Sequence, residues 1–440
     1  MADWKAGCAR ENITPEKPVV LLGYGDRTRA FDSVAEQIFV KALALEDETG
    51  HRAVIVTADL VGFQAAVTTN LVCTRLEQDT GLKREQFLFN ASHSHTGPLV
   101  SLDPVLEANA VAHAPLSETD RANTIAYTES LHEKVVAVVK AALDALQPAA
   151  IAFGEGRVDF PMNRRLLADG KVIMTDNPEG VTDRSVPVIK VVDADKKTMA
   201  LLFGCACHNT SLTGADNVIA GDYAGVAQFQ LEAAHPGALA MFMSGCGGNA
   251  NPSPRGGMVH AKQHGKTLAD EVTRVASGDL SPVQGPLKTK YAIVDLPLQQ
   301  LALETLEVMS EYSSSEALMA RHMLSVVRRG ETLLTHYSAP FAVWQFGNSL
   351  ALIALPGEPM AEYAHALKKL NSDVRTWVAG YSNDCFGYLP TAQVVREGGH
   401  EAIGVTQWVW VNALRRQAGF FTEDVERVVV ENVQILMKEE

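Results

Sequence analysis

The sequence predicts an α/β fold on three observations. Short apolar or β-branched runs, typical of strands, alternate with longer helical stretches along all 440 residues. Apolar residues make up 47% and charged residues 20% of the chain, which is ordinary for a globular protein. No repeat, low-complexity segment or Pro/Gly/Ser-rich linker separates the runs. Although the length could hold about two or three average domains, we expect one continuous unit over residues 1–440.

Strands and helices are expected in turn through the first half of the chain. Apolar runs predict strands at 39–45, 53–58, 87–89, 150–153, 186–192, 199–207 and 238–243. Helices are expected from about 60 to 82, at 122–146 before Gln147-Pro148, and from 222 to about 235. Residues 99–119 are rich in Ala, Leu and Pro without a clear period. They could form a lid over the neighbouring histidines or an ordinary long loop.

The second half continues in the same way. Strands are expected at 288–296, 341–346, 349–355 and 375–380, with Gly347-Asn348 joining the middle pair as a hairpin. Helices are expected at 316–328, after Pro359, at 405–416 and at 423–438.

Charge and cysteine content narrow the class of protein. The formal net charge is −14 and no Lys/Arg-rich block is present, which argues against nucleic acid as a partner. The six cysteines show no disulfide-framework spacing: Cys8, Cys73, Cys205, Cys207, Cys246 and Cys385.

No apolar stretch is long enough to predict a transmembrane segment. The N-terminus lacks the apolar region of an export signal, so a cytoplasmic location is the default; a periplasmic or secreted protein trimmed of its signal would look the same. Nothing specifies an oligomeric state.

Two histidines, His93 and His95, follow the apolar run 87–89, and Gly97-Pro98 ends the segment. If the chain is still extended there, both rings point to the same side, because side chains on a strand alternate. That placement suits a metal ligand beside a proton-transfer group, or two ligands. Two polar residues that simply end a strand would show the same pattern.

Further candidate ligands also follow expected strands. His208 follows 199–207, Glu358 follows 349–355, and the loop from Tyr381 to Tyr388 follows 375–380. Zinc is bound by imidazole nitrogen and carboxylate oxygen, and a catalytic site keeps one position open for water. Taken singly, His208 could be a core histidine and Glu358 an acid at a helix N-terminus. Their recurrence at strand ends is what favours a metal site.

An ordered set of short motifs then resembles the catalytic domain of the neutral (non-lysosomal) ceramidase family, metal-dependent amidohydrolases. The motifs run from about residue 6 to about residue 402: Ala6-Gly7 to Ile13-Thr14-Pro15 followed by Gly23-Tyr24, Ala58-Asp59-Leu60, His93-Ser94-His95-Thr96-Gly97-Pro98, Asn163-Arg164, His208, Gly221-Asp222, Gly248 to Pro252, Pro356-Gly357-Glu358 and Tyr388. The resemblance implies stacked mixed β-sheets flanked by helices, with a metal at one rim.

The resemblance also assigns residue roles. It implies one Zn²⁺ per chain, with four ligands: His93, His208, Glu358 and Tyr388. His95 would be the acid–base group near the scissile carbonyl, and Arg164 matches an active-site arginine of the family. His400 stands where the family has a tyrosine that steadies the oxyanion, a role that an imidazole N–H can also fill. Asn251 stands where the family has a serine, and its amide can both donate and accept hydrogen bonds.

The resulting hypothesis is a zinc-dependent hydrolase that cleaves an amide, ester or lactone bond by metal-activated water. The substrate would be a small-molecule amide or ester, either a lipid such as ceramide or something smaller and more polar. Asn251, His400 and the expected absence of a C-terminal immunoglobulin-like domain depart from the family pattern. One alternative is a catalytically lapsed binding protein on the same scaffold. A metal-dependent phosphoesterase ranks lower, because two metals would need several carboxylates and the ligand set has one.

Overall fold

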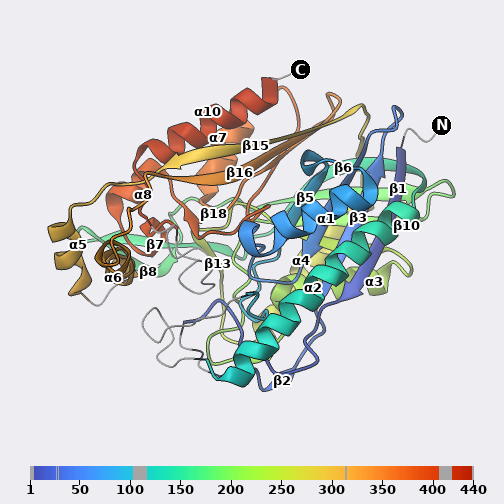
Figure 1. Ribbon diagram of the computed structural model, residues 1–440. Coiled ribbons are helices and arrows are strands. Elements are labelled where there is room, and N and C mark those ends of the chain that lie inside the picture. The colour runs from blue at the N-terminus through green and yellow to red at the C-terminus, as the bar shows by residue number, and fades with distance from the viewer. Residues whose placement is uncertain are drawn as a thin grey trace.

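The computed structural model of the protein describes residues 4–102 except 26 and 28, 116–312, 315–405 and 419–438. Two β-sheets lie face to face in its middle, and helices cover their outer faces (Figure 1). The helix expected at 405–416 and most of segment 99–119 lie outside the described residues. Within the described part of the chain, no helix is long and apolar enough to cross a bilayer.

The larger sheet is mixed and has nine strands. Its order is β12-β10-β9-β6-β1-β3-β4-β5, and β14 pairs with β6. The strands are β1 (Trp4–Asn12), β3 (Phe39–Glu46), β4 (Arg52–Ala58), β5 (Phe87–Ala91), β6 (Gln147–Arg157), β9 (Ser185–Asp193), β10 (Thr198–Cys205), β12 (Leu239–Ser244) and β14 (Ser281–Pro282). Most neighbours are antiparallel, but β4 with β5 and β10 with β12 run parallel at the two ends of the sheet.

Alternating side chains bury both faces of this sheet. On β3, Ala42 and Ala44 pack beneath α1 (Asn70–Thr80) and α2 (Glu118–Asp144), whereas Leu43 and Leu45 face the second sheet. In the same way β10 and β12 face α3 (Asp222–Ala234) and α4 (Met258–Ala276) on one side and the second sheet on the other. Helices α3 and α4 approach closely at Gly265, where an added Cβ would lie 2.5 Å from Val226 Cβ.

The second sheet has four strands in the order β15-β16-β17-β19. They are β15 (Leu287–Pro297), β16 (His336–Phe346), β17 (Leu350–Ala354) and β19 (Thr376–Ala379); the first three are antiparallel, and β17 runs parallel to β19. Its outer face packs against α6 (Ser315–Arg328), α7 (Ala361–Leu370) and α10 (Asp424–Lys438). Two shorter helices are α5 (Leu303–Ser310) and α8 (Ala392–Glu397).

Short elements gather around one rim. A three-stranded sheet joins β13 (Ala250–Pro252), β7 (Pro161–Ala168) and β8 (Lys171–Asn177); β18 (Glu358–Pro359) pairs with β20 (Tyr388–Leu389), and β2 (Ser33–Val34) pairs with β11 (Val218–Ile219). Single turns are η1 (Ala65–Thr69), η2 (Arg84–Gln86) and η3 (His400–Ala402). Isolated bridges pair Asn90 with Ser382 and Gly245 with Ala379, so the ends of β5, β12 and β19 meet at this rim.

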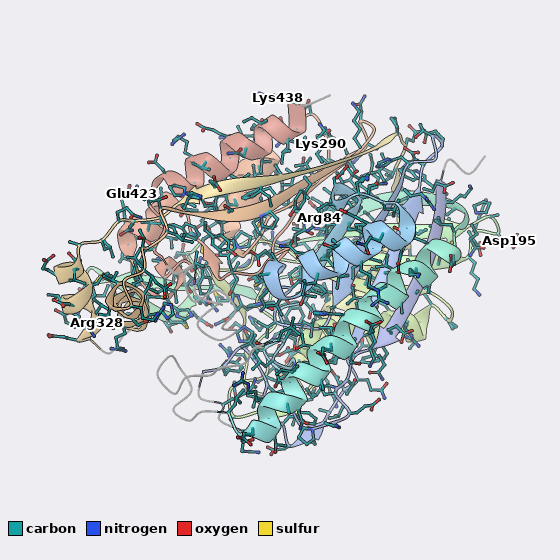
Figure 2. The ribbon with its side chains drawn as sticks, in the orientation of Figure 1. Arg84, Asp195, Lys290, Arg328, Glu423 and Lys438 are labelled. Carbon is teal, nitrogen blue, oxygen red and sulfur yellow. The ribbon has the colours of Figure 1, made fainter. Side chains whose placement is uncertain are left out.

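Charged side chains mark the outside of these layers. Asp195, Arg328, Glu423 and Lys438 point away from the ribbon (Figure 2). Arg84 instead reaches across from η2, and its guanidinium lies 4.2 Å from the centroid of the Tyr291 ring on β15.

The predicted α/β class and the stacking of mixed sheets flanked by helices are confirmed. Strand β1 and the β7–β8 hairpin were not predicted. Only one end of β1 is well buried, and β8 is mostly exposed, so neither shows a clear apolar run.

Candidate metal centre

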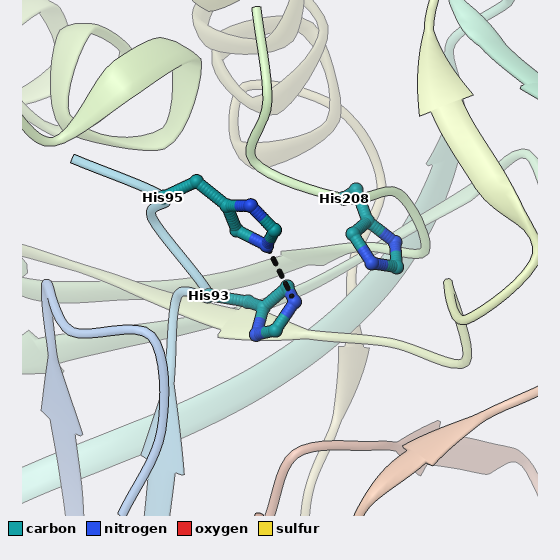
Figure 3. Close-up of side chains that lie close together, drawn as sticks. All are labelled: His93, His95 and His208. Atoms are coloured by element: carbon teal, nitrogen blue, oxygen red, sulfur yellow. Dashed lines mark hydrogen bonds between the residues drawn. The ribbon is translucent and has the colours of Figure 1, made fainter. Parts of the chain in front are cut away.

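His93 and His95 lie in the loop after β5, but not in the extended conformation that the sequence suggested. Strand β5 ends at Ala91, and His93 has a φ of 60°, in the left-handed region. The loop nevertheless turns the two rings together, with centroids 4.7 Å apart and the Nε2 atoms 3.0 Å apart (Figure 3). The condition of an extended backbone is therefore not met, but the two rings still lie together.

His208 and Glu358 come to the same place from other elements. His208 follows β10 and is fully buried, and its ring centroid lies 4.7 Å from that of His93. Glu358 belongs to β18, and its Oε2 lies 3.2 Å from His93 Nε2 and 3.1 Å from His208 Nε2. Burial and the positive charge of Arg164 lower the pKa of His208 to about 3, so this ring is neutral at pH 7.

Backbone carbonyls fix which ring nitrogens carry a proton. His93 Nδ1 lies 2.6 Å from the Val61 carbonyl oxygen, and His208 Nδ1 lies 2.8 Å from that of Gly247. A carbonyl can only accept, so each Nδ1 must donate. Because the His208 ring is neutral, its Nε2 carries a lone pair and no proton. Metal-ligating histidines in proteins are commonly held by this Nδ1–H···O=C arrangement.

Three possible ligand atoms therefore converge. Glu358 Oε2 faces the Nε2 atoms of His93 and His208, and among the described residues neither His208 Nε2 nor Glu358 Oε2 has a hydrogen-bond partner. Such a buried convergence costs free energy unless a cation lies between the atoms. These donors fit a metal ion of the kind that takes imidazole and carboxylate ligands.

Two overlapping groups have the spacing of metal ligands. The donor atoms of His93, His95 and His208 lie within 4.8 Å of one another, and so do those of His93, Glu358 and Cys385. Cys385 was not singled out in the sequence, although it lies three residues before Tyr388. Its Sγ is 4.0 Å from the Val61 carbonyl oxygen, the group that accepts from His93 Nδ1. Cys385 therefore lies close to both His93 and Glu358.

His95 lies on one side of these atoms. His95 Nε2 lies 3.0 Å from His93 Nε2, and among the described residues the buried His95 Nδ1 has no partner. Burial, with His93 and His208 adding to it, lowers the pKa of His95 well below its usual range. His95 is therefore a neutral imidazole beside the converging atoms.

Tyr388 and His400 lie on another side. Tyr388 on β20 is the direct cross-strand neighbour of Glu358 on β18. Its ring stacks at 6.4 Å from that of His208, and its ring and the His400 ring make an edge contact at 5.2 Å. Burial raises the pKa of the Tyr388 hydroxyl although Arg164 opposes it, and burial lowers the pKa of His400.

Arg164 ties this side together. From β7 it donates to the Tyr388 hydroxyl at 2.9 Å, to Asn251 Oδ1 at 3.1 Å and to the Gly248 carbonyl at 2.9 Å. Its Nε pairs with Glu401 Oε1 at 2.8 Å. Glu401, which the sequence did not reveal as a site residue, also pairs with Arg165 at 2.7 Å.

The structure thus brings together every residue that the sequence singled out for the site. The candidate ligands and the acid–base histidine lie in mutual contact: His93, His95, His208 and Glu358. Next to them is a second group of contacting residues: Tyr388, His400, Arg164 and Asn251. Asn251 accepts from Arg164 and from Thr210 Oγ1 at 3.2 Å through its Oδ1, which leaves its NH₂ group as the free end among the described residues.

Comparison with known proteins gives the family. The sequence model described as neutral/alkaline non-lysosomal ceramidase, N-terminal, matches residues 4–301. The chain belongs to this ceramidase family. The resemblance stated from the motifs is therefore confirmed.

The sequence identity to ceramidases of two organisms is low. Neutral ceramidase of Pseudomonas aeruginosa is 23% identical over 261 residues, 57% of this chain and 37% of that protein. Neutral ceramidase of Drosophila melanogaster is 22% identical over 342 residues, 74% of this chain and 47% of that protein. The chain thus spans less than half the length of these relatives.

Solved structures agree on the fold. The crystal structure of neutral ceramidase from Pseudomonas aeruginosa superimposes with a TM-score of 0.72, over 98% of this chain and 73% of that one, at 19% identity. A ceramidase complexed with C2 gives a TM-score of 0.71 at 18% identity, over 100% of this chain and 77% of that one.

Proposed function

We propose that the protein is a zinc-dependent hydrolase that cleaves an amide bond, or a related ester or lactone. One Zn²⁺ per chain would be held by His93, His208, Glu358 and Tyr388. The observation that carries this proposal is the convergence of two imidazole nitrogens on one buried carboxylate oxygen. Membership of a ceramidase family supports it. Because both sheets contribute to this one site, we also propose that residues 1–440 act as a single catalytic unit.

Zinc in such a site supplies Lewis acidity, polarising a carbonyl group and making water a better nucleophile near neutral pH. The chain's own residues would do the rest. His95 is neutral, so it can take a proton from the attacking water and pass it to the leaving nitrogen or oxygen. The His400 imidazole, beside Tyr388, would donate to the oxyanion of the tetrahedral intermediate.

Arg164 and Asn251 would hold this arrangement in place. All four contacts of Arg164 are to protein groups, so we assign it to positioning Tyr388 and Asn251 rather than to contacting substrate. The free NH₂ of Asn251 would donate to a polar group of the substrate. A small-molecule amide or ester, lipid or polar, fits these roles.

Metal analysis of the purified protein tests the proposal. We expect about one zinc per chain in wild type and in the control His336→Ala, whose side chain is 49% exposed on β16, and none in His208→Ala. His95→Ala should keep its zinc and lose turnover of N-acyl amides and chromogenic acyl esters. No stoichiometric metal in wild type would refute the proposal, and loss of zinc from His95→Ala would require the roles of His93 and His95 to be reassigned.

A second candidate is a binding protein that has lost catalysis on the same scaffold. Asn251 and His400, in place of the serine and tyrosine of the family pattern, favour it. Bound zinc with no hydrolysis of any amide, ester or lactone tested would support this reading. Turnover that disappears in His95→Ala would exclude it.

A further inference from the structure

Arg255 contacts Tyr24, the residue whose ring packs against His95, and has no carboxylate partner among the described residues. Its Nη2 donates to the Tyr24 hydroxyl at 2.9 Å, and the Tyr24 ring packs edge-on against the His95 ring at 5.0 Å. Tyr24 donates in turn to the Leu212 carbonyl at 2.7 Å, which fixes its hydroxyl. Within the described part of the chain, no Asp or Glu pairs with Arg255, no partner accepts from its Nε or Nη1, and its Nε is buried.

The segment that carries Arg255 is held in place. The backbone N–H groups of Gly256 and Gly257 both donate to the Ser211 carbonyl at 2.9 Å. Both glycines have positive φ, 121° and 119°, so the sequence Gly-Gly permits a turn that other residues would strain. Arg255 itself is half-buried. The backbone contacts of Gly256 and Gly257 fix its segment and so hold Arg255 beside Tyr24.

Nearby charges do not neutralise Arg255 by contact. Asp222 is the carboxylate that interacts with it electrostatically, but both Asp222 oxygens accept backbone N–H groups, from Leu212 at 2.8 Å and Tyr223 at 2.6 Å. Arg27 adds a second positive charge here, since it donates to the His95 carbonyl and stacks 4.9 Å from the Tyr24 ring centroid. Two arginines thus contact the Tyr24 side chain that packs against His95.

These arginines are on the leaving-group side of the proposed reaction, because His95 is the group that would protonate the leaving atom. We propose that the substrate is an N-acyl amine whose amine portion carries an anionic group, a carboxylate or a phosphate, bound by Arg255. The proposal rests on the proposed function for its direction. Arginine suits such a group because its planar donors match the oxygens of carboxylate and phosphate. Hydrolysis would add water across the C–N bond and release a carboxylic acid and the free anionic amine.

Three matched probes test this: N-lauroylglycine, its neutral analogue N-lauroylglycinamide, and N-lauroyl-O-phosphoethanolamine. Wild type should prefer at least one anionic probe to the neutral one. In Arg255→Gln the ratio of kcat/KM for that probe over the neutral probe should fall roughly 10- to 100-fold, the range of a hydrogen bond to a charged group. Arg255→Lys should keep part of the preference. The control Arg427→Gln makes the same change in net charge on the exposed face of α10, and should keep all of it. The anionic probe whose kcat/KM preference depends on Arg255 shows whether the substrate carries a carboxylate or a phosphate.

Equal kcat/KM for anionic and neutral probes in wild type, or a preference that survives Arg255→Gln, would overturn the inference while leaving the hydrolase proposal intact. If no probe is hydrolysed, the binding of the same probes is measured by isothermal titration calorimetry. Tighter binding of an anionic probe to wild type, lost in Arg255→Gln, would support the anionic site although the hydrolase proposal had failed. Equal binding of all probes would overturn the anionic site as well.

Discussion

Replacing Glu401 with Gln would leave two buried guanidinium groups without their shared carboxylate. Glu401 is 1% exposed and pairs with Arg164 through Oε1 and with Arg165 through Oε2. The Arg164 and Arg165 side chains are each only 6% exposed, so water cannot solvate the two guanidinium groups once the carboxylate is gone. Arg165 would keep its pair with Glu397 at 3.2 Å, but Arg164 would have no ion-pair partner among the described residues. A buried charge without a partner is far more costly than an exposed one.

The pKa of Glu401 gives the size of the effect. Burial raises this pKa, but Arg164, His400 and Arg165 together lower it from the ordinary 4.5 to about 2. At about 1.4 kcal/mol per pKa unit, the ionised Glu401 contributes roughly 3 kcal/mol to the free energy of unfolding at pH 7. Breaking a buried ion pair by removing one partner costs about 3–5 kcal/mol in other proteins, which agrees.

The same shift predicts a pH dependence. Because the pKa of Glu401 is lower in the folded chain than in the unfolded chain, its contribution is full above pH 4.5 and is lost as the pH falls toward 2. We expect roughly 2 kcal/mol of it to remain at pH 3.5.

Urea unfolding of wild type and Glu401→Gln at pH 7 and pH 3.5 measures both quantities. Glu423→Gln is the matched control, since Glu423 pairs with Arg396 at 2.6 Å with both side chains 55% exposed. Such a surface pair is worth at most about 1 kcal/mol. A loss below about 1 kcal/mol for Glu401→Gln at pH 7, or the same loss at both pH values, would refute the reasoning.

Three further predictions follow from the site and the helix packing. His400→Ala should lower kcat/KM about 100- to 1000-fold, as for loss of an oxyanion donor, whereas His400→Tyr should restore much of it; equal losses would argue against an oxyanion role. Chelation should lower the melting temperature of wild type but not of His208→Ala, and zinc should restore it; a chelator-insensitive wild type would contradict the metal site. Gly265→Ala should destabilise the protein by about 1–3 kcal/mol, because its Cβ would lie 2.5 Å from Val226 Cβ. Gly225→Ala, whose Cβ would meet only Glu36 Oε2 at 3.5 Å, should be neutral or stabilising by up to about 1 kcal/mol, and equal effects in thermal unfolding would contradict the packing argument.

Much of the fold was predictable because its buried strands are nearly continuous apolar runs. Strands β5 and β12 are buried at every position, and their sequences show it directly. Strand β1 was missed because Lys5, Arg10 and Glu11 interrupt its apolar pattern at exposed positions. The stacking of the two sheets has no local signal and came only from the family resemblance.

Some residues of the candidate site could likewise be predicted from the sequence, and others could not. His93, His208 and Glu358 could be found because each follows a readable strand, and the ends of those strands meet at one rim. Glu401 could not be found, because it pairs with Arg164 across 237 residues of sequence and a surface acid has the same local pattern. The left-handed backbone at His93 was also hidden, because Ser92, His93 and Ser94 carry no glycine to indicate it. Arg255 and Tyr24 meet only through tertiary packing.

The meeting of the two sheets at one rim also sets an order of events during synthesis. His93 leaves the ribosome roughly 300 residues before Tyr388, which at about 5–20 residues per second is a delay of roughly 15–60 s. During that time the N-terminal sheet can form its core, but its histidines have no carboxylate opposite them, because Glu358 has not yet been made. A nascent chain would therefore hold metal weakly, and full affinity would arise only when the second sheet docks. Metal loading would then be one of the last steps of maturation and a direct readout of correctly completed folding.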